Sequence, residues 1–516
     1  MIDLDHAATT PLDVRVLEAM LPWLTRHLGN PASDHAAGRL ARAAVEQARA
    51  QVAALVGATP AEIVWTSGAT ESNNLALKGA LEFLGLKGAQ IVTSRTEHKS
   101  VLDTCRHLET QGVRVTYLKP DAGGAIPAAD VLGALTPHTA LVSLMWVNNE
   151  TGAINPVVEL APLLRERGVL FHVDAVQAAG RLPIDLAQVP IDLLSLSAHK
   201  FYGPKGVGAL FVRKRPRARL APQMHGGGHE QGMRSGTVAT HQVVGMGAAA
   251  ELAQGQLVAD AARLAPLRDA LATRLLTLPG VHLNGGPQNR AAHILNLSFE
   301  GVEGESLRAL LPDLAVSSGS ACSAATREPS YVLRALGRDD ELAGASLRFS
   351  LGRGTTSQEI EQAAQQVIAA VTRLRSLASG AGPVPDAANG HDAYGYSAPT
   401  WRSFRDSRRA GSFAGDHTSL VEARAGSPAA KGFVRLQLRL AQGRVADARF
   451  QAYGCPATIA VGAWLAEYAI GRSLAEIGRI DSAGLRTALE IPEDRAHCAL
   501  MGEDLCRALS HTPTSP

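Results

Sequence analysis

The feature that most constrains this chain is a regular alternation of two kinds of segment between residue 13 and about residue 377. Short runs rich in apolar and β-branched residues alternate with longer Ala-, Leu-, Glu- and Arg-rich stretches of helical period. This spacing predicts an α/β fold with a mainly parallel sheet and helices on both faces. The short runs are almost continuously apolar, as buried parallel strands are. They read IVWTSG, QIVTSR, VRVTYL, ALVSLMWV, VLFHVDA, LLSLSAHK and GALFVRK.

The pattern changes twice along the chain. We expect a large domain over about residues 13–254 and a small α+β domain over residues 1–12 and 255–378. Residues 379–396 are rich in Gly, Pro, Ser and Asn, which is typical of a linker. Residues 397–516 form a further module. Its predicted strands, FVRLQLRL and GRVADARFQAY, are joined by a Gln-Gly turn and followed by helices.

Charge and cysteine content exclude several classes of protein. The 516 residues carry 50 Lys+Arg and 48 Asp+Glu, so nothing favours nucleic acid or an anionic membrane as a partner. The longest apolar runs are far too short to cross a bilayer, and the N-terminus has no apolar signal segment. Five cysteines exclude a disulfide scaffold. We therefore expect a cytoplasmic protein in which each cysteine needs its own explanation.

Three segments at predicted strand ends carry candidate chemistry. The string TSGATESNN, which begins at Thr66, offers N–H groups and a helix dipole to a phosphate, although alone it reads as an ordinary helix N-cap. Asp174 can pair with a pyridinium nitrogen, although a single Asp there is more often a turn residue. Lys200 can form a Schiff base, and a surface lysine is an equal alternative. Together, in this order, they indicate a pyridoxal 5'-phosphate site.

Residues 1 to about 377 resemble the NifS/IscS-type cysteine desulfurases, which are fold-type I pyridoxal-phosphate enzymes. The resemblance implies a large sheet domain, a small C-terminal domain and a homodimer in which both subunits touch each cofactor. It is carried by LDHAATTPLD, TSGATESNN, TEHKSVLDTCR, VNNETG, HVDAVQAAG, SAHKFYGPKGVG, QMHGGGHEQGMRSGT, VSSGSACSAATREPSYVLRALG and SLRFSLGR.

The resemblance assigns roles to individual residues. Lys200 holds the cofactor covalently, Asp174 pairs with its ring nitrogen, and Gln177 bonds its ring hydroxyl. His98 stacks on the ring and shuttles protons. Arg348 binds the substrate carboxylate in a bidentate manner. The further residues that the resemblance implies are Asn149 for substrate and cofactor, Ala69, Thr70, Ser197 and His199 for the phosphate, and Thr237 reaching in from the partner subunit.

Cys322 is the candidate nucleophile. It lies in SSGSACSAA, a stretch of small residues with little to pack, which argues against a buried structural cysteine. The resemblance implies that Cys322 takes the sulfur of L-cysteine, leaves L-alanine, and passes its persulfide to a protein acceptor such as an iron–sulfur scaffold. His98 is the candidate base for its thiol. Cys105, on a predicted helix, is interpreted as structural.

Two other activities of the same fold compete with this interpretation. An aminotransferase needs no thiol, so the loop that carries Cys322 argues against it. A selenocysteine lyase-like enzyme remains an alternative.

The C-terminal module resembles the IscU/NifU N-terminal scaffold family, through WRSFRDSRRAGSF, FVRLQLRLAQGRVADARFQAYGC and HCALMGEDLCRAL. In that family three cysteines bind a cluster or zinc. The resemblance implies Cys455, His497 and Cys498 as metal ligands, with zinc or an iron–sulfur cluster as the candidate cofactor. Ala430 stands where the first cysteine is expected, and Gly432 where an Asp is expected.

With three ligands at most, a complete scaffold is disfavoured, since Cys506 is eight residues beyond Cys498 on a predicted helix. Four interpretations stay open. The module binds metal at a three-ligand site, accepts a persulfide on Cys455 or Cys498, only docks partners, or makes the chain a bifunctional desulfurase–scaffold protein.

Overall fold

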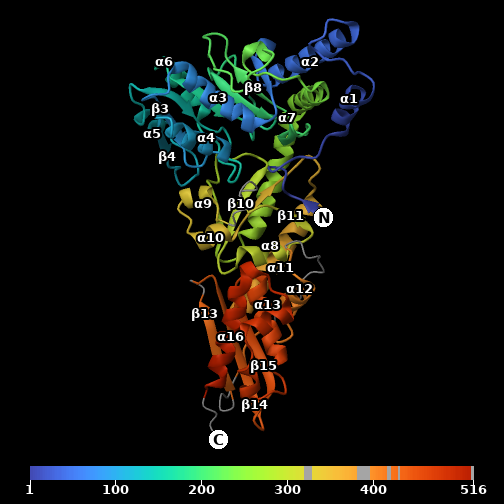
Figure 1. Ribbon diagram of the computed structural model, residues 1–516, viewed down its shortest axis with the longest axis vertical. Coiled ribbons are helices and arrows are strands. Elements are labelled where there is room, and N and C mark those ends of the chain that lie inside the picture. The colour runs from blue at the N-terminus through green and yellow to red at the C-terminus, as the bar shows by residue number, and fades with distance from the viewer. Residues whose placement is uncertain (319–327, 381–394, 415–419, 428–429, 513–516) are drawn as a thin grey trace.

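The computed structural model describes residues 1–318, 328–380, 395–414, 420–427 and 430–512. Three parts follow one another along the long axis of the molecule (Figure 1). An α/β part, coloured blue to green, lies at one end, and the C-terminal module, in orange and red, lies at the other. A smaller α+β part lies between them. The α/β class that the sequence predicts is confirmed.

Seven strands form the large sheet, in the order β2-β8-β7-β6-β5-β3-β4. Neighbouring strands are parallel except for β8, which is antiparallel to both β2 and β7. Each strand lies within a run that the sequence predicts, except that β5 begins one residue before its run. The strands are β2 (Ile63–Thr66), β3 (Gln90–Ser94), β4 (Arg114–Leu118), β5 (Thr139–Ser143), β6 (Leu170–Asp174), β7 (Leu193–Ser197) and β8 (Gly208–Val212).

Helices cover both faces of this sheet, because successive residues of a strand point to opposite sides. Val64 and Leu210 belong to a cluster with α3 and α4, whereas the adjacent Trp65 and Phe211 pack with α2, α6 and the start of α7. The helices of this part are α1 (Val14–Thr25), α2 (Ala36–Leu55), α3 (Ala69–Leu84), α4 (Lys99–Glu109), α5 (Ala128–Gly133), α6 (Val157–Glu166) and α7 (Thr240–Leu275).

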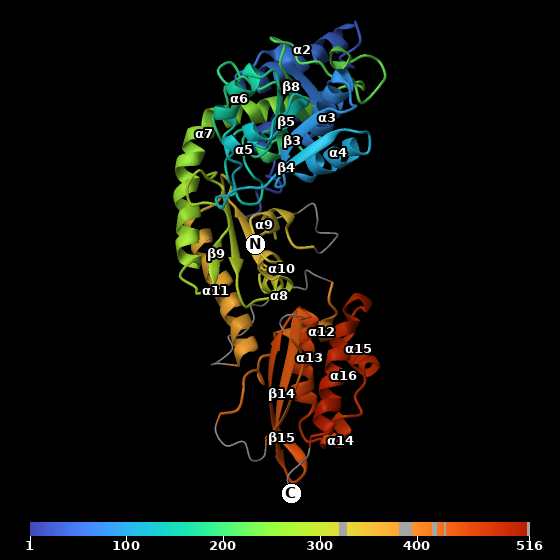
Figure 2. The same ribbon diagram turned by 90° about the vertical axis from the view of Figure 1, so that its left-hand side faces the viewer.

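The middle part contains an antiparallel sheet, β12-β10-β9, and a parallel pair, β1-β11, that ties the N-terminus to it. Helices α7 and α11 run lengthwise beside it (Figure 2). Its strands are β1 (Ile2–Asp3), β9 (Val281–Leu283), β10 (Ile294–Phe299), β11 (Leu314–Ala315) and β12 (Ser346–Ser350). Its helices are α8 (Gly304–Ala309), α9 (Tyr331–Ala335), α10 (Asp340–Gly344) and α11 (Ser357–Ser379).

The module is a three-stranded antiparallel sheet packed against helices. The predicted Gln-Gly turn is confirmed, since Gln442 and Gly443 have φ angles of 52° and 72°, as a two-residue hairpin turn requires. Strand β13 was not predicted from the sequence. The strands are β13 (Leu420–Ser427), β14 (Gly432–Ala441) and β15 (Arg444–Tyr453), and the helices are α12 (Ala398–Arg405), α13 (Pro456–Tyr468), α14 (Leu474–Ile477), α15 (Ser482–Leu489) and α16 (Ala496–Ser510).

The module is joined to the middle part by a continuous apolar core and by polar contacts. One buried hydrophobic cluster includes residues of both. Ser306 donates a hydrogen bond to the carbonyl oxygen of Gly454 over 2.7 Å, and the Tyr453 hydroxyl donates to Glu341 over 2.7 Å. Within the described ranges, no helix combines the length and apolar character needed to cross a bilayer.

Candidate active site and thiol pocket

A cavity of about 530 Å³ lies at the carboxyl ends of the parallel strands. Open α/β sheets bind ligands at this edge. The structure brings together there all but two of the residues that the sequence predicted for cofactor, substrate and catalysis. Those that line the cavity are Ala69, Thr70, His98, Asn149, Asp174, Gln177, Ser197, His199, Lys200 and Arg348.

Lys200 ends a short 3-10 turn, Ala198–Lys200, that continues directly from β7. Its ammonium donates hydrogen bonds of 2.7 Å to the carbonyl oxygens of Ala7 and Ala8. The N-terminal segment therefore forms part of the lysine's surroundings, a role that the sequence did not indicate.

Asp174 ends β6 and is almost completely buried. Its carboxylate accepts hydrogen bonds from Asn73 over 2.9 Å and from the backbone N–H of Val176 over 3.0 Å. Gln177, in the following turn, donates to the carbonyl oxygen of Ala7 over 2.9 Å. The strand end therefore holds a fixed carboxylate that faces the cavity, as a partner for a ring nitrogen must.

The candidate phosphate site combines the N-terminus of α3 with the end of β7. Gly68 caps α3 with a φ of 153°, a conformation that favours glycine. Small residues at this helix start leave backbone N–H groups accessible to an anion. From the other side, His199 bonds Thr9 over 3.1 Å, and burial lowers the pKa of His199 to about 4. A neutral imidazole can donate a hydrogen bond to a phosphate oxygen without titrating near neutral pH.

His98 and Arg348 come from opposite sides of the cavity. His98 caps α4, and its Nδ1 lies 2.8 Å from the Ser100 hydroxyl, which fixes the ring orientation. Arg348, on β12, is 2% exposed and donates hydrogen bonds of 2.8 Å to the carbonyl oxygen of Asn149 and to the carboxylate of Asp5. A guanidinium held by backbone and carboxylate is well placed to bind a substrate carboxylate.

The cavity fits pyridoxal phosphate by the chemistry of its lining. It offers an amine for a Schiff base, a buried carboxylate and a helix N-terminus. The Oδ1 atom of Asn149 is also buried without a hydrogen-bond partner among the described residues, as expected for a group that faces a ligand. Lys205, Glu150 and Tyr331 also line the cavity, and none of them was predicted. The sequence did not single them out, because each lies outside the three strand-end segments that carry candidate chemistry.

Two predicted residues are not in this cavity. Thr237 is exposed on this chain and does not line it, so its expected contribution to the partner subunit's cofactor stays a prediction. Cys322 lies outside the described residues. The preceding Ser317 pairs through its backbone with Arg348, with N···O distances of 2.7 and 3.3 Å.

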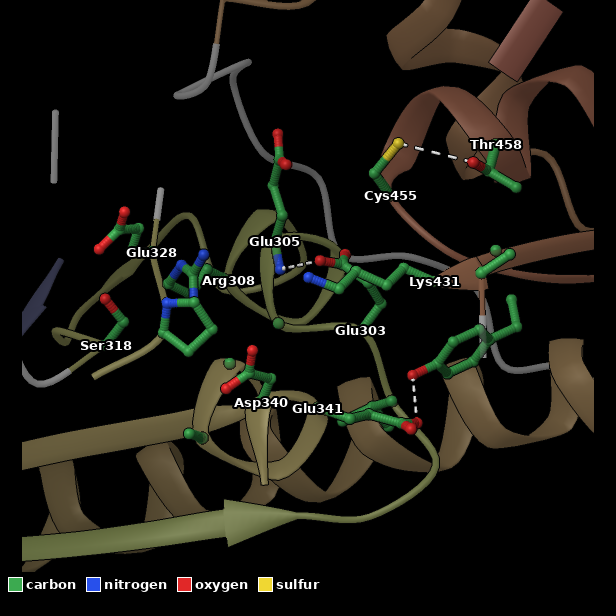
Figure 3. A pocket seen from close by; sticks show the side chains of 18 of the residues that line it. Glu303, Glu305, Arg308, Ser318, Glu328, Asp340, Glu341, Lys431, Cys455 and Thr458 are labelled. Carbon is green, nitrogen blue, oxygen red and sulfur yellow. Dashed lines mark hydrogen bonds between the residues drawn. The ribbon is translucent and has the colours of Figure 1, made fainter. Parts of the chain in front are cut away.

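A second cavity, of about 720 Å³, lies between the middle part and the module. Figure 3 shows Cys455 and Lys431 on one side of it and Ser318 and Glu328 on the other. Ala430 and His497 also line it. Ser318 and Glu328 are the described residues nearest in the chain to the segment that contains Cys322.

Cys455 and Cys498 face one another beside this second cavity. Their Sγ atoms are 3.6 Å apart, and the Thr458 hydroxyl lies 3.6 Å from Cys455 Sγ and 3.3 Å from Cys498 Sγ. The hydrogen bond from the Cys498 thiol lowers the pKa of Cys455 to about 7, although burial opposes this, and the same contact raises the pKa of Cys498. His497 Nε2 lies 3.4 Å from Cys498 Sγ.

The candidate metal ligands do not fit a complete metal site. Zinc and iron centres in proteins take four ligands, and here the cavity presents an alanine, Ala430, beside Cys455 and His497. Among the described residues, no group of three or more His, Cys, Asp or Glu side chains is placed to hold a metal ion. Cys105 and Cys506 are both buried in helices, and burial raises the pKa of each thiol.

Comparisons with known proteins agree with these sites. Residues 2–363 match the family Aminotransferase class-V, and residues 395–511 match the NifU-like N terminal domain. The fold and the cavity thus define a pyridoxal-phosphate enzyme of the class-V aminotransferase type, followed by a NifU-like domain. Within that class, the chain belongs to the cysteine desulfurase family.

The relatives that show this are close. The chain is 56% identical over 375 residues to a cysteine desulfurase IscS of Methylococcus capsulatus, covering 72% of this chain and 93% of that protein. It is 57% identical over 379 residues to one of Stutzerimonas stutzeri, covering 73% and 94%. Among solved structures, a NifS-like protein matches with a TM-score of 0.66 at 36% identity, covering 71% of this chain and 98% of that one.

Proposed function

We propose that this enzyme converts L-cysteine to L-alanine and holds the released sulfur as a persulfide on Cys322. The observation that carries the proposal is the convergence of Lys200, Asp174 and Arg348 on one cavity. Pyridoxal phosphate, when bound, supplies an electron sink that acidifies the substrate Cα–H bond. Asp174, whose carboxylate is held by a hydrogen bond from Asn73, would pair with the ring nitrogen.

The chain's own residues bind and orient the substrate and move its protons. Arg348 binds the substrate carboxylate and so turns the Cα–H bond toward Lys200, whose Nζ accepts that proton. His98, with its ring fixed by Ser100, exchanges protons at the substrate and at the attacking thiol. The Cys322 thiolate forms a bond to the substrate sulfur while the Cβ–S bond breaks. The electron pair of the Cβ–S bond stays on the three-carbon product, which takes up protons to become alanine.

The test is the Cys322→Ala variant of the full chain. We expect it to keep the yellow colour of the loaded cofactor and to lose the release of alanine and sulfide from L-cysteine. Alanine release that survives in Cys322→Ala would contradict the nucleophile assignment. Cys105→Ala is the matched control, because Cys105 is a buried thiol on α4 that does not line the active-site cavity.

We further propose that the module accepts this sulfur on Cys455, within the same chain, for iron–sulfur cluster assembly. The support is that Ser318 and Glu328, on either side of the segment with Cys322, line the same cavity as Cys455. Persulfide mapping after incubation with L-cysteine tests this. The mapping uses Cys498→Ala, so that the neighbouring thiol cannot react with the sulfur on Cys455. We expect label on Cys322 and Cys455 in this variant, and on Cys322 alone when Cys455→Ala is added. Label confined to Cys322 in Cys498→Ala would contradict transfer.

A homodimer is the expected assembly. Helix α1 exposes a row of large apolar side chains, among them Val14, Leu17, Leu21 and Leu24, which is typical of a contact surface. Sedimentation of the full chain should give twice the chain mass. Leu17→Glu combined with Leu21→Glu should shift it to the monomer.

A further inference from the structure

We propose that Cys455 and Cys498 form a resolving thiol pair, in which Cys498 cleaves a persulfide on Cys455 and releases its outer sulfur as hydrogen sulfide. The inference rests on the proposed function, since the desulfurase supplies the sulfur. It goes further because it makes the module a source of free sulfide rather than a persulfide store or a metal centre.

The distance between the two thiols is short enough for exchange. Their Sγ atoms are 3.6 Å apart, and both lie at the start of a helix, with Cys455 capping α13 and Cys498 in the first turn of α16. A disulfide bond needs about 2.0 Å between the sulfurs, a change within reach of side-chain rotation.

Cys455 and Cys498 differ in their access to the cavity, and this difference indicates which of the two receives the incoming sulfur. Cys455 lines the cavity between the module and the middle part, so it is the thiol that an incoming sulfur reaches. Cys498 is fully buried, does not line that cavity, and lies behind Cys455. A persulfide therefore forms on Cys455, and its inner sulfur then lies beside the Cys498 thiol.

His497 supplies the proton transfer that this step needs. Its Nε2 lies 3.4 Å from Cys498 Sγ, and its side chain lines the cavity. Imidazole can accept the Cys498 proton and return it to the departing sulfide. The Thr458 hydroxyl, within hydrogen-bonding distance of both sulfurs, orients the pair.

The reaction balances without an added oxidant. Cys455–S–SH and Cys498–SH give a Cys455–Cys498 disulfide and H₂S. The S–S bond of the persulfide breaks and a new S–S bond forms between the two cysteine sulfurs. The outer sulfur leaves as sulfide with the electron pair of the broken bond, and it takes up the proton that Cys498 loses. A thiol reductant, either a small thiol or a dithiol protein, must then reduce the disulfide before another cycle.

The missing ligand supports this chemistry over metal binding. Ala430 lines the cavity at the position where the resemblance to the scaffold family implies its first cysteine. Two thiols with one imidazole are too few for a closed four-ligand centre, and they suffice for thiol exchange. The alanine therefore leaves the pair available for redox chemistry.

The experiment uses the holoenzyme, desalted and free of oxygen, with one equivalent of L-cysteine per chain and no other thiol. We expect equal amounts of alanine and sulfide and a disulfide-linked pair of peptides that contain Cys455 and Cys498. In Cys498→Ala we expect unchanged alanine, loss of the sulfide signal, and a persulfide that persists on Cys455. Cys506→Ala, a buried thiol on the same helix, should behave like the unchanged chain.

A second arm separates this proposal from the desulfurase assignment. In Lys200→Ala, glutathione persulfide replaces L-cysteine as the sulfur donor, and the same disulfide and sulfide are expected. If circular dichroism shows that Cys498→Ala is unfolded, the presence or absence of the Cys455–Cys498 disulfide in the unchanged chain tests the resolving pair.

A persulfide that remains on Cys455 with no disulfide, or sulfide release that survives in a folded Cys498→Ala, overturns the resolving pair. Absence of alanine in the first arm, with the second arm as expected, would instead count against the proposed desulfurase function.

Discussion

The side-chain amide of Asn73 donates a hydrogen bond of 2.9 Å to the Oδ2 atom of Asp174. Both residues are buried, and Asn73 also bonds the Ser100 hydroxyl over 2.8 Å, which in turn bonds His98. One amide thus supports both the carboxylate assigned to the cofactor ring and the histidine assigned to proton transfer. We interpret Asn73 as a positioning residue for the active site.

The variant Asn73→Ala should therefore weaken cofactor binding. A hydrogen bond to a charged group contributes about 1.5–3 kcal/mol, so cofactor affinity should fall by about tenfold or more. Titration of the apoprotein with pyridoxal phosphate, followed by absorbance, measures this. Asn74→Ala, next on the same helix, is the control, because among the described residues the Asn74 side chain bonds only the local carbonyl oxygen of Thr70. Equal affinity in both variants would remove the positioning role.

Arg348→Lys should raise KM for L-cysteine far more than it lowers kcat. Lysine keeps the charge but cannot bind a carboxylate with two parallel hydrogen bonds. The loss of one charge-assisted bond predicts a rise in KM of about tenfold or more. Steady-state alanine formation measures both constants. Arg274→Lys, which changes an exposed ion pair with Glu361, should leave both unchanged.

Several parts of this site follow from the sequence, and others depend on contacts between distant segments. Lys200 and Asp174 were predictable because strand ends of a parallel sheet meet at one edge. The carbonyl oxygens of Ala7 and Ala8 that accept from Lys200 were not, because nothing local to the N-terminus indicates where it lies. Strand β13 was missed because its Ala and Gly residues give a weak β signal.

The cavity beside Cys455 also could not be predicted. It exists only where the module meets the middle part, and the sequence does not give that relative placement. The spacing of Cys455, His497 and Cys498 indicated thiol or metal chemistry. Spacing along the chain could not show that the two sulfurs lie 3.6 Å apart.

Glu150 should make the stability of the protein depend on pH. Burial raises the pKa of its carboxyl to about 7, above the value for an unfolded chain. Between the unfolded and the folded pKa, the folded state therefore binds more protons, so the contribution of Glu150 is present at low pH and is lost as the pH rises through about 7. Glu150→Gln stays neutral at every pH. Its Tm minus that of the unchanged chain should therefore be larger at pH 8 than at pH 5.5.

The measurement is the difference in Tm between Glu150→Gln and the unchanged chain at several pH values. Glu159→Gln, at an exposed position on α6, should show no such trend. A Tm difference that does not change with pH would mean that Glu150 is ionised in the folded protein throughout.

Glu305 should control sulfur delivery without controlling alanine formation. Its carboxylate forms an ion pair with Arg495 of the module and accepts a 2.7 Å hydrogen bond from the Tyr396 hydroxyl. Glu305→Arg places like charges together at a largely buried contact, which is strongly destabilising for the docked module.

We expect alanine formation by Glu305→Arg within about twofold of the unchanged chain, because Glu305 does not line the active-site cavity. In a Cys498→Ala background, where the persulfide on Cys455 persists, its amount should fall by about tenfold or more, as for the loss of a few kcal/mol at the contact. Glu300→Arg, an exposed change in the same part of the chain, is the control. An undiminished signal on Cys455 would mean that delivery does not need this docked arrangement.

Ala430→Cys should convert the thiol pocket into a metal site. Ala430 lines the same cavity as Cys455 and His497, so a thiol there adds the ligand that the pocket lacks. With Cys498 the set reaches four, the number that structural zinc requires. We expect about one zinc ion per chain of Ala430→Cys after growth with zinc, and much less in the unchanged protein. Elemental analysis measures this.

The control is Ala425→Cys on β13, since Ala425 does not line the cavity. A second readout separates the two chemistries. Bound zinc should suppress disulfide formation between Cys455 and Cys498, because a coordinated thiolate is a poorer nucleophile for exchange. Stoichiometric zinc in the unchanged chain would show that three protein ligands already suffice, and the alanine at position 430 could then no longer explain why the thiols exchange sulfur.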